Sequence, residues 1–258
     1  MTSALSGLVD KYHARTPPRT WSLLVSVFGE LARAQDDHLS AADLGAWLAD
    51  LGVEPGLVRT ALSRLVANGT LIRARTGRAA AYRLSPQAGA EFRSAADIIY
   101  GGALPQPTGR VVLNVLDHCP DRAGARAALI ADGARLLGST VFVRPEHAGR
   151  EHLRPEGALV FVTAPDAALR GKADALWSLT ALDAAYRAVT ESAGALLAEA
   201  TQMAPREAVL ARIMLVHEFR RVVLRDPFLP SALLPEDWSG VRARMRFDAA
   251  YARLNVTK

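Results

Sequence analysis

The sequence predicts an α+β protein in three parts: an N-terminal winged helix-turn-helix, a central ferredoxin-like α/β domain and a helical C-terminal domain. Three helical patterns and two short extended runs predict the first part, over residues 18–85. Buried-strand patterns around one helix predict the second, over 109–166, and helical periodicity dominates 167–258. Residues 86–108 are expected to form a connecting helix and a linker rich in glycine and proline.

The first two helices of the N-terminal part are indicated by apolar periodicity and by capping residues. Trp21–Ala34 carries apolar residues at helical spacing. The next helix is expected to begin after Ser40, an N-cap residue, with Asp43 in the capping-box position three residues later. Gly52 is the residue type that most often ends a helix, so this helix is short.

A third helix and a hairpin follow directly. Pro55–Ala67 has proline in its first turn and Asn68-Gly69 as its stop signal. Two extended runs, "TLIRAR" and "AAYRLS", then flank a turn at Thr76-Gly77-Arg78. Three helices followed by a two-stranded wing is the order of elements in a winged helix-turn-helix.

The charge of this segment changes abruptly along the chain. Residues 30–54 hold six acids and one arginine, whereas residues 55–90 hold six arginines and no acid. A carboxylate would repel the phosphates that dominate affinity for DNA. The missing acids therefore favour DNA binding over a solvated helix and hairpin, which is the alternative explanation of the arginines.

A helical wheel separates the third helix into two faces. Val58, Ala61, Leu62 and Leu65 share the face that would pack on the preceding helices. The opposite face would enter the major groove, where arginine can bond a guanine edge and Ser or Thr can reach bases or phosphates. We call this face the recognition surface; it comprises Arg59, Thr60, Ser63 and Arg64. The hairpin arginines, Arg73, Arg75 and Arg78, are expected to meet phosphates or the minor groove.

The remaining elements are predicted from shorter signals. The run "RVVLNVLD" (110–117) is a buried strand, a helix follows over Arg122–Leu137, and "STVFVRP" and "ALVFVTAP" are two further strands. Long helices are expected over 168–200 and 205–224, and a last helix toward the C-terminus. The proline-rich stretch between them, 225–238, is expected to be a packed arm, with a pocket as the alternative.

The sequence resembles the PaaX-type repressor family in two separate places. "VRTALSRLVANG" and its neighbours are similar to the family's N-terminal domain, and "HEFRRVVLRDPFLPSALLPEDWSG" is similar to its C-terminal signature. The resemblance implies a homodimeric repressor of a catabolic operon, for phenylacetate in the namesake. It also implies a palindromic DNA operator, release by an acyl- or aryl-CoA effector such as phenylacetyl-CoA, and no resident cofactor.

A basic cluster on the predicted helix 205–224 is the candidate effector site. It consists of His217, Arg220 and Arg221. Arginine forks match the phosphates of coenzyme A, so direct contact is one hypothesis, and a surface face paired with neighbouring acids is the other.

Composition limits the other functions. The sequence shows no signal peptide, no apolar run long enough for a membrane span and only one cysteine, Cys119, so we expect a cytoplasmic protein. It also shows no glycine-rich phosphate loop, His-x-x-x-His zinc pair or Gly-x-Ser-x-Gly nucleophile elbow, so we do not expect an enzyme. The alternative function is a metal-dependent nuclease built on the central domain, with Asp117 at the end of its first strand and His118 beside it.

Overall fold

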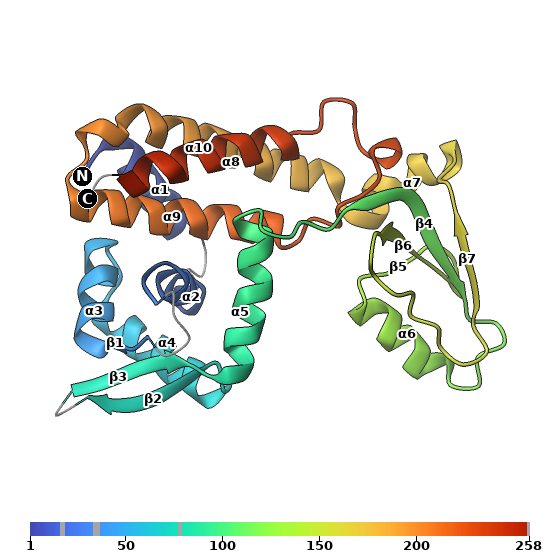
Figure 1. The fold of residues 1–258 in the computed structure, drawn as a ribbon, viewed down its shortest axis with the longest axis horizontal. Coiled ribbons are helices and arrows are strands. Elements are labelled where there is room, and N and C mark those ends of the chain that lie inside the picture. Colours follow the sequence, from blue (N-terminus) through green and yellow to red (C-terminus); the bar gives the residue numbers. More distant parts are fainter. Residues whose placement is uncertain (16–18, 33–36, 77–78, 257–258) are drawn as a thin grey trace. The chain divides into compact units, whose positions relative to one another are not determined.

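The computed structural model describes residues 1–15, 19–32, 37–76 and 79–256, and it divides into two compact units (Figure 1). Unit 1 contains Met1–Gly102, Tyr186–Leu224 and Val241–Lys258, and unit 2 contains Ala103–Ala185 and Arg225–Gly240. The predicted α+β class is confirmed. The two units interleave along the chain, whereas the predicted domains follow one another, so the units do not correspond to those domains one to one. The predicted domain boundaries stay a prediction.

Unit 1 begins with four helices. They are α1 (Ser3–His13), α2 (Thr20–Leu31), α3 (Ala41–Asp50) and α4 (Pro55–Ala67). Helices α2, α3 and α4 correspond to the three predicted helices, and α4 has the predicted bounds. The first predicted helix extended to Ala34, and residues 33 and 34 lie outside the described part of the chain. The sequence prediction missed α1, which buries Leu5, Leu8 and Tyr12 and packs against the distant helix α9 (Pro205–Val223).

The capping prediction for α3 is confirmed. The Ser40 hydroxyl oxygen accepts a hydrogen bond from the Asp43 backbone N–H at 3.0 Å, and the hydroxyl donates to Asp43 Oδ2 at 2.6 Å. Gly52 follows the helix with φ +73°, a conformation that glycine adopts without strain. The N-terminus of α3 is therefore fixed by its own sequence.

A small antiparallel sheet follows α4. Its strands are β1 (Leu39–Ser40), β2 (Leu71–Thr76) and β3 (Ala79–Leu84), in the order β1-β3-β2. The predicted hairpin is β2 and β3, in register from Leu71 opposite Leu84 to Thr76 opposite Ala79. The short strand β1 was not predicted. Ser85 then caps α5 (Pro86–Ile99) by accepting a hydrogen bond from the Ala88 N–H at 3.2 Å.

Helices from late in the sequence complete unit 1. They are α9, most of α8 (Leu179–Glu199) and α10 (Gly240–Val256), and Figure 1 shows α9 running alongside α10. The rings of Phe219 and Phe247 stack with centroids 4.1 Å apart. Arg244 lies 4.5 Å from the Phe219 ring centre and donates hydrogen bonds to the carbonyls of Ile98 and Ile99, which end α5. The core of unit 1 therefore joins both ends of the chain.

Unit 2 is built on a four-stranded antiparallel sheet. Its strands are β4 (Pro107–Val115), β5 (Arg135–Leu136), β6 (Val141–His147) and β7 (Leu159–Thr163), in the order β5-β6-β4-β7. The helix α6 (Arg122–Ala131) lies between β4 and β5 in sequence. The predicted helix over 122–137 is too long, because Gly133 turns the chain at φ +89° and residues 135–136 join the sheet.

The predicted helix over 168–200 is divided in two. Helix α7 (Ala167–Trp177) ends at Ser178, which takes the left-handed conformation at φ +55°, and α8 begins immediately afterwards. The Asp174 carboxylate accepts a hydrogen bond from the Thr180 N–H at 2.6 Å, which holds the break. That hydrogen bond also lowers the pKa of Asp174.

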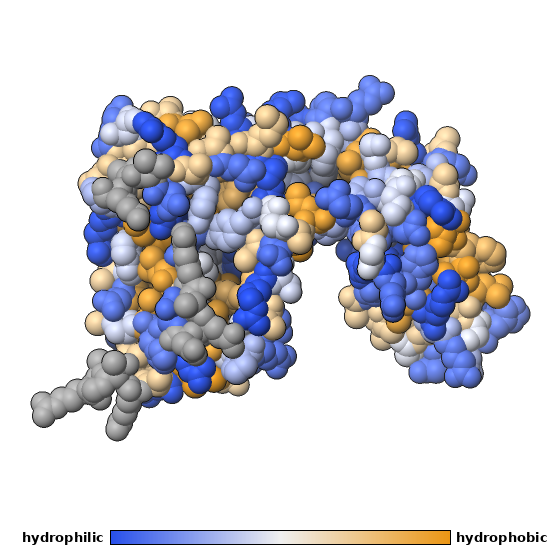
Figure 2. Space-filling model, in the orientation of Figure 1, coloured by the Kyte–Doolittle hydropathy of each residue, from blue (hydrophilic) through white to orange (hydrophobic). Residues whose placement is uncertain are grey.

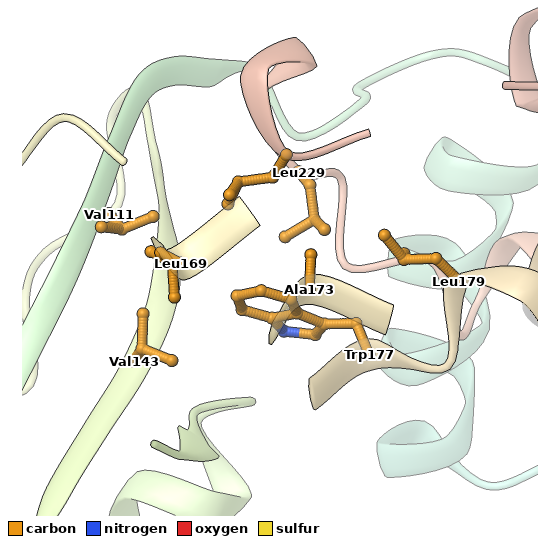
Figure 3. Close-up of a cluster of buried hydrophobic side chains, with 8 residues drawn as sticks. Val111, Val143, Leu169, Ala173, Trp177, Leu179 and Leu229 are labelled. Atoms are coloured by element: carbon orange, nitrogen blue, oxygen red, sulfur yellow. The ribbon is translucent and has the colours of Figure 1, made fainter. Parts of the chain in front are cut away.

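One hydrophobic cluster of unit 2 lies between the sheet and α7, and another involves α6. Figure 3 shows Leu169, Ala173 and Trp177 of α7 with Val111 and Val143 of the sheet. The proline-rich stretch contributes to the cluster with α7 through Leu229 and Leu233, which lies in a short 3-10 helix, η2 (Ser231–Leu233). The His147 ring nitrogen Nε2 lies 3.0 Å from the Phe228 carbonyl oxygen, a second link to this stretch. The packed-arm prediction is confirmed.

Candidate nucleic-acid interface

Helix α4 exposes the predicted recognition surface. Val58, Ala61, Leu62 and Leu65 are all buried, and Arg59, Thr60, Ser63 and Arg64 are all exposed. The apolar side packs on α2 and α3. The two faces of the wheel are therefore correct, whereas DNA contact by the exposed face stays a prediction.

Two local contacts hold side chains of the recognition surface. The Thr60 hydroxyl donates a hydrogen bond to the Gly56 carbonyl at 3.0 Å, inside the helix. The Arg64 guanidinium carbon lies 5.6 Å from the centre of the Trp21 ring of α2, at cation–π distance. Sequence reasoning used Trp21 only as an apolar helix residue, and its contact with Arg64 depends on how α2 packs against α4.

The hairpin arginines are described to different extents. Arg73 is exposed on β2, opposite Tyr82 of β3. The backbone of Arg75 pairs with that of Ala80. The Arg75 side chain and the whole of Arg78 lie outside the described residues.

Helices α2 and α9 share a group of hydrogen-bonded polar side chains, which we call the α2–α9 polar cluster. Its members are Ser22, Ser26, His217 and Arg220. Arg220 Nε donates to the Ser26 hydroxyl at 2.8 Å, and Arg220 Nη2 donates to the Ser22 hydroxyl at 2.7 Å and the Ser22 carbonyl at 2.8 Å. The Ser26 hydroxyl also lies 3.0 Å from His217 Nδ1.

Burial controls the protonation of this cluster. Burial, followed by the charges of Arg220 and Arg221, lowers the pKa of His217 well below its ordinary value. Burial and the neighbouring Arg221 lower the pKa of Arg220 to about 10. At neutral pH the imidazole is therefore neutral and the guanidinium is charged.

The three residues of the candidate effector cluster do not form one surface. His217 is only 2% exposed. Arg220 lines a cavity of about 580 Å³ within unit 1. The Arg221 side chain is 37% exposed and lies 3.9 Å from Glu218, a carboxylate that also accepts from Arg15 at 2.8 Å. The alternative hypothesis for this cluster was a surface face paired with neighbouring acids, and Arg221 has such a pair in Glu218.

A buried carboxylate, which sequence reasoning missed, joins four helices next to this cluster. Glu30 of α2 accepts hydrogen bonds from the Tyr100 hydroxyl at 2.5 Å, the Tyr251 hydroxyl at 3.2 Å and Arg212 Nε at 2.8 Å. Burial and then the Glu30 charge raise the pKa of Tyr100, which keeps its hydroxyl a donor. The available signal was an acid inside the apolar run "WSLLVSVFGEL".

The candidate metal position has few of the required neighbours. Asp117 follows β4 and is exposed, while Cys119 is buried in an apolar cluster with Leu116 and Phe142. Within the described residues, no group of three or more His, Cys, Asp or Glu side chains is placed to hold a metal ion. In the same residues no helix combines the length and apolar character that crossing a membrane requires.

Comparisons with known proteins find a family and two similar proteins. The model of the PaaX-like protein family matches residues 19–88, and that of the PaaX-like protein C-terminal domain matches 177–257. The transcriptional repressor PaaX of Escherichia coli (strain K12) is 31% identical over 252 residues, covering 90% of this chain and 79% of the repressor. The structure of the uncharacterized protein Rv0674 from Mycobacterium tuberculosis is similar with a TM-score of 0.51 and 25% identity, covering 90% of this chain and 97% of that one. The chain therefore belongs to the PaaX-like protein family.

Proposed function

We propose that this chain is a DNA-binding transcriptional repressor of a catabolic operon. Helices α2, α3 and α4 with the β2–β3 hairpin have the order of elements of a winged helix-turn-helix. The observation that carries the proposal is the exposed recognition surface of α4, in a segment from which acids are absent. The 31% identity to a named transcriptional repressor supports it.

In this proposal α4 enters the major groove of the operator. Arg64 bonds a guanine edge, with Arg59, Thr60 and Ser63 as further contacts to bases or phosphates. The hairpin arginines contact the backbone, which fixes the register of α4 but reads no sequence directly. Trp21 supports the proposal because its ring lies against Arg64 and restricts the range of positions that side chain can take.

The operator is proposed to be a palindrome bound by a homodimer. Two copies would place their recognition surfaces in successive major grooves, about 34 Å apart. Unit 2 offers one candidate surface for pairing: Leu159 and Phe161 of the edge strand β7 are 47% and 51% exposed, and Figure 2 shows hydrophobic colour over this edge. The strand order of the central part, β5-β6-β4-β7, supports its ferredoxin-like assignment. The first and third strands in sequence, β4 and β6, lie side by side at the centre of the sheet, and β5 and β7 form its edges.

Release is proposed to follow binding of an acyl- or aryl-CoA effector, of which phenylacetyl-CoA is the first to test. Arg220 and Arg221 are the proposed contacts with the effector. His217 is proposed to position Arg220, because both side chains contact the Ser26 hydroxyl. A ligand that favours a conformer with low DNA affinity must itself be bound less tightly when DNA is present.

Selection of DNA by the purified protein tests the proposal. Fragments from a random library that the wild type retains are measured by fluorescence anisotropy at several salt concentrations. We expect Arg64→Ala to lose about 1–3 kcal/mol on the selected sequence and to discriminate less between sequences. We expect Arg73→Ala to weaken all sequences alike and to reduce the salt slope by about one.

The matched control is Arg126→Ala, which removes the same charge from an exposed position on α6 of unit 2. If Arg126→Ala matches Arg64→Ala, net charge alone explains the binding. If the wild type enriches no sequence, the proposed function is wrong.

A further inference from the structure

The cavity in unit 1 has the size and the walls of a small-molecule site. Its volume is about 580 Å³, within the range of ligand pockets. Apolar side chains supply most of the wall, from α2 (Val25), α5 (Phe92 and Ile99) and α9 (Val216). A cavity lined in this way favours a ligand with an apolar body.

One charged group in the wall lacks a counter-ion. Arg220 donates Nε and Nη2 to neutral oxygens of Ser22 and Ser26, and among the described residues no carboxylate pairs with it and no hydrogen bond uses its Nη1. A partly buried cation is costly unless an anion or a strong acceptor completes it. An oxygen of a ligand in the cavity can supply that acceptor.

We propose that this cavity binds an acyl group whose apolar body fills the space between α2, α5 and α9 and whose carbonyl or carboxylate oxygen accepts hydrogen bonds from Arg220. The chemistry is shared by a free carboxylate and by the acyl end of a thioester. For the consequence of binding, release of DNA, the inference rests on the proposed function.

The position of the cavity gives the ligand a direct effect on the DNA-binding elements. Its wall includes residues of α2, which packs on α4, and Leu84, the last residue of the hairpin strand β3. Its wall also includes Gly89 and Phe92 of α5, which begins two residues after that strand. A ligand seated there contacts both the support of the recognition surface and the base of the hairpin, so a change in either arrangement changes its affinity.

Gly29 makes the proposal testable without disrupting the fold. It lines the cavity from the middle of α2, and a Cβ atom built on it meets no atom within 4 Å. A larger side chain at this position therefore occupies the cavity, and replacing a helical glycine also favours the helix. Gly29→Leu should fold and should exclude the acyl group.

The experiment uses isothermal titration of the full chain with phenylacetate, octanoate, phenylacetyl-CoA, octanoyl-CoA and coenzyme A. We expect at least one acyl-bearing probe to bind and coenzyme A alone to bind much more weakly. Gly29→Leu and Arg220→Gln should each raise the Kd of that probe about 10–100-fold, and Arg126→Ala should not change it. Thermal unfolding of each variant verifies that it is folded.

The outcomes separate the sources and the proposals. Binding of the free acids identifies a carboxylate ligand, and binding of the thioesters alone identifies the acyl end of coenzyme A conjugates. Unchanged affinity in folded Gly29→Leu, equal binding of unacylated coenzyme A, or no binding by any probe overturns the inference. A protein that selects DNA but binds no acyl probe loses this inference and the proposed effector and keeps the proposed DNA-binding function. One that binds the probe but no DNA keeps this cavity as a binding site and loses the proposed repressor function.

Discussion

Replacing Glu30 by alanine should destabilise unit 1 strongly. The substitution leaves the Arg212 guanidinium, whose side chain is 11% exposed, without its carboxylate, a loss that costs about 3–5 kcal/mol when a pair is buried. The Tyr100 and Tyr251 hydroxyls lose their acceptor as well. Arg212 keeps its hydrogen bond to Asn255 at 3.0 Å, so the penalties do not simply add. We expect a loss of about 4 kcal/mol in the free energy of unfolding.

Urea titration and differential scanning calorimetry measure this loss. A change of that size lowers Tm by roughly 8–16 °C in a domain of this class. Glu30→Gln keeps one carbonyl acceptor but no charge, and it should lose about 2 kcal/mol. Glu191→Ala, at an exposed position on α8, is the control. A loss below about 1 kcal/mol in Glu30→Ala would refute the assignment of Glu30 as the carboxylate that joins the four helices.

Three further predictions concern a cap, a titration and the packed arm. Ser40→Ala should lower the urea midpoint by an amount equivalent to about 1 kcal/mol, and Ser40→Asn should restore most of it; equal midpoints for all three proteins would refute the cap. His217 has its pKa lowered in the folded state, so the unfolded state binds more protons below about pH 6.5 and stability falls as the solution is acidified, by up to about 1.4 kcal/mol per pH unit. Thermal unfolding from pH 7 to pH 5.5 should show this slope reduced in His217→Asn, and an unchanged slope would contradict the neutral imidazole. Leu229→Ala should cost unit 2 about 2–5 kcal/mol, whereas Leu224→Ala, at a more exposed position, should cost about 0.5 kcal/mol or less; similar losses in urea titration would contradict the buried arm.

Local signals predicted the bounds of α4 and the N-terminus of α3 well. Helix α4 has the bounds that its proline and its Asn-Gly stop indicated, and the cap at Ser40 has the expected hydrogen bonds. The two faces of α4 were also predictable, because helical periodicity depends on neighbours within two turns. These features need no information from the rest of the chain.

Features that depend on distant partners were not predictable in the same way. Helix α1 carries Leu5, Leu8, Val9 and Tyr12 at helical spacing, a local signal that the prediction overlooked; no such signal identifies its packing partner α9, about 200 residues away in sequence. The roles of Glu30 and Arg220 depend on the packing of α2 against α9, which no local pattern encodes. His217, Arg220 and Arg221 were grouped by proximity in sequence. His217 and Arg220, three positions apart on the helix, do share the Ser26 hydroxyl, whereas Arg221, one position after Arg220, is directed to another side, beside Glu218.

The interleaving of the two units has a consequence for protein synthesis. Ribosomes complete the segment up to Gly102 early, yet its core needs Phe247 and Arg244 of α10. Residues 103–240 must be translated in between, which takes roughly 10–30 s. Unit 2 has all its segments by Gly240, so it can finish folding first, although unit 1 begins earlier. Unit 1, which holds the candidate nucleic-acid interface, thus stays incomplete through most of translation. A nonsense mutation before α10 would therefore damage unit 1, although its N-terminal segment is synthesised first.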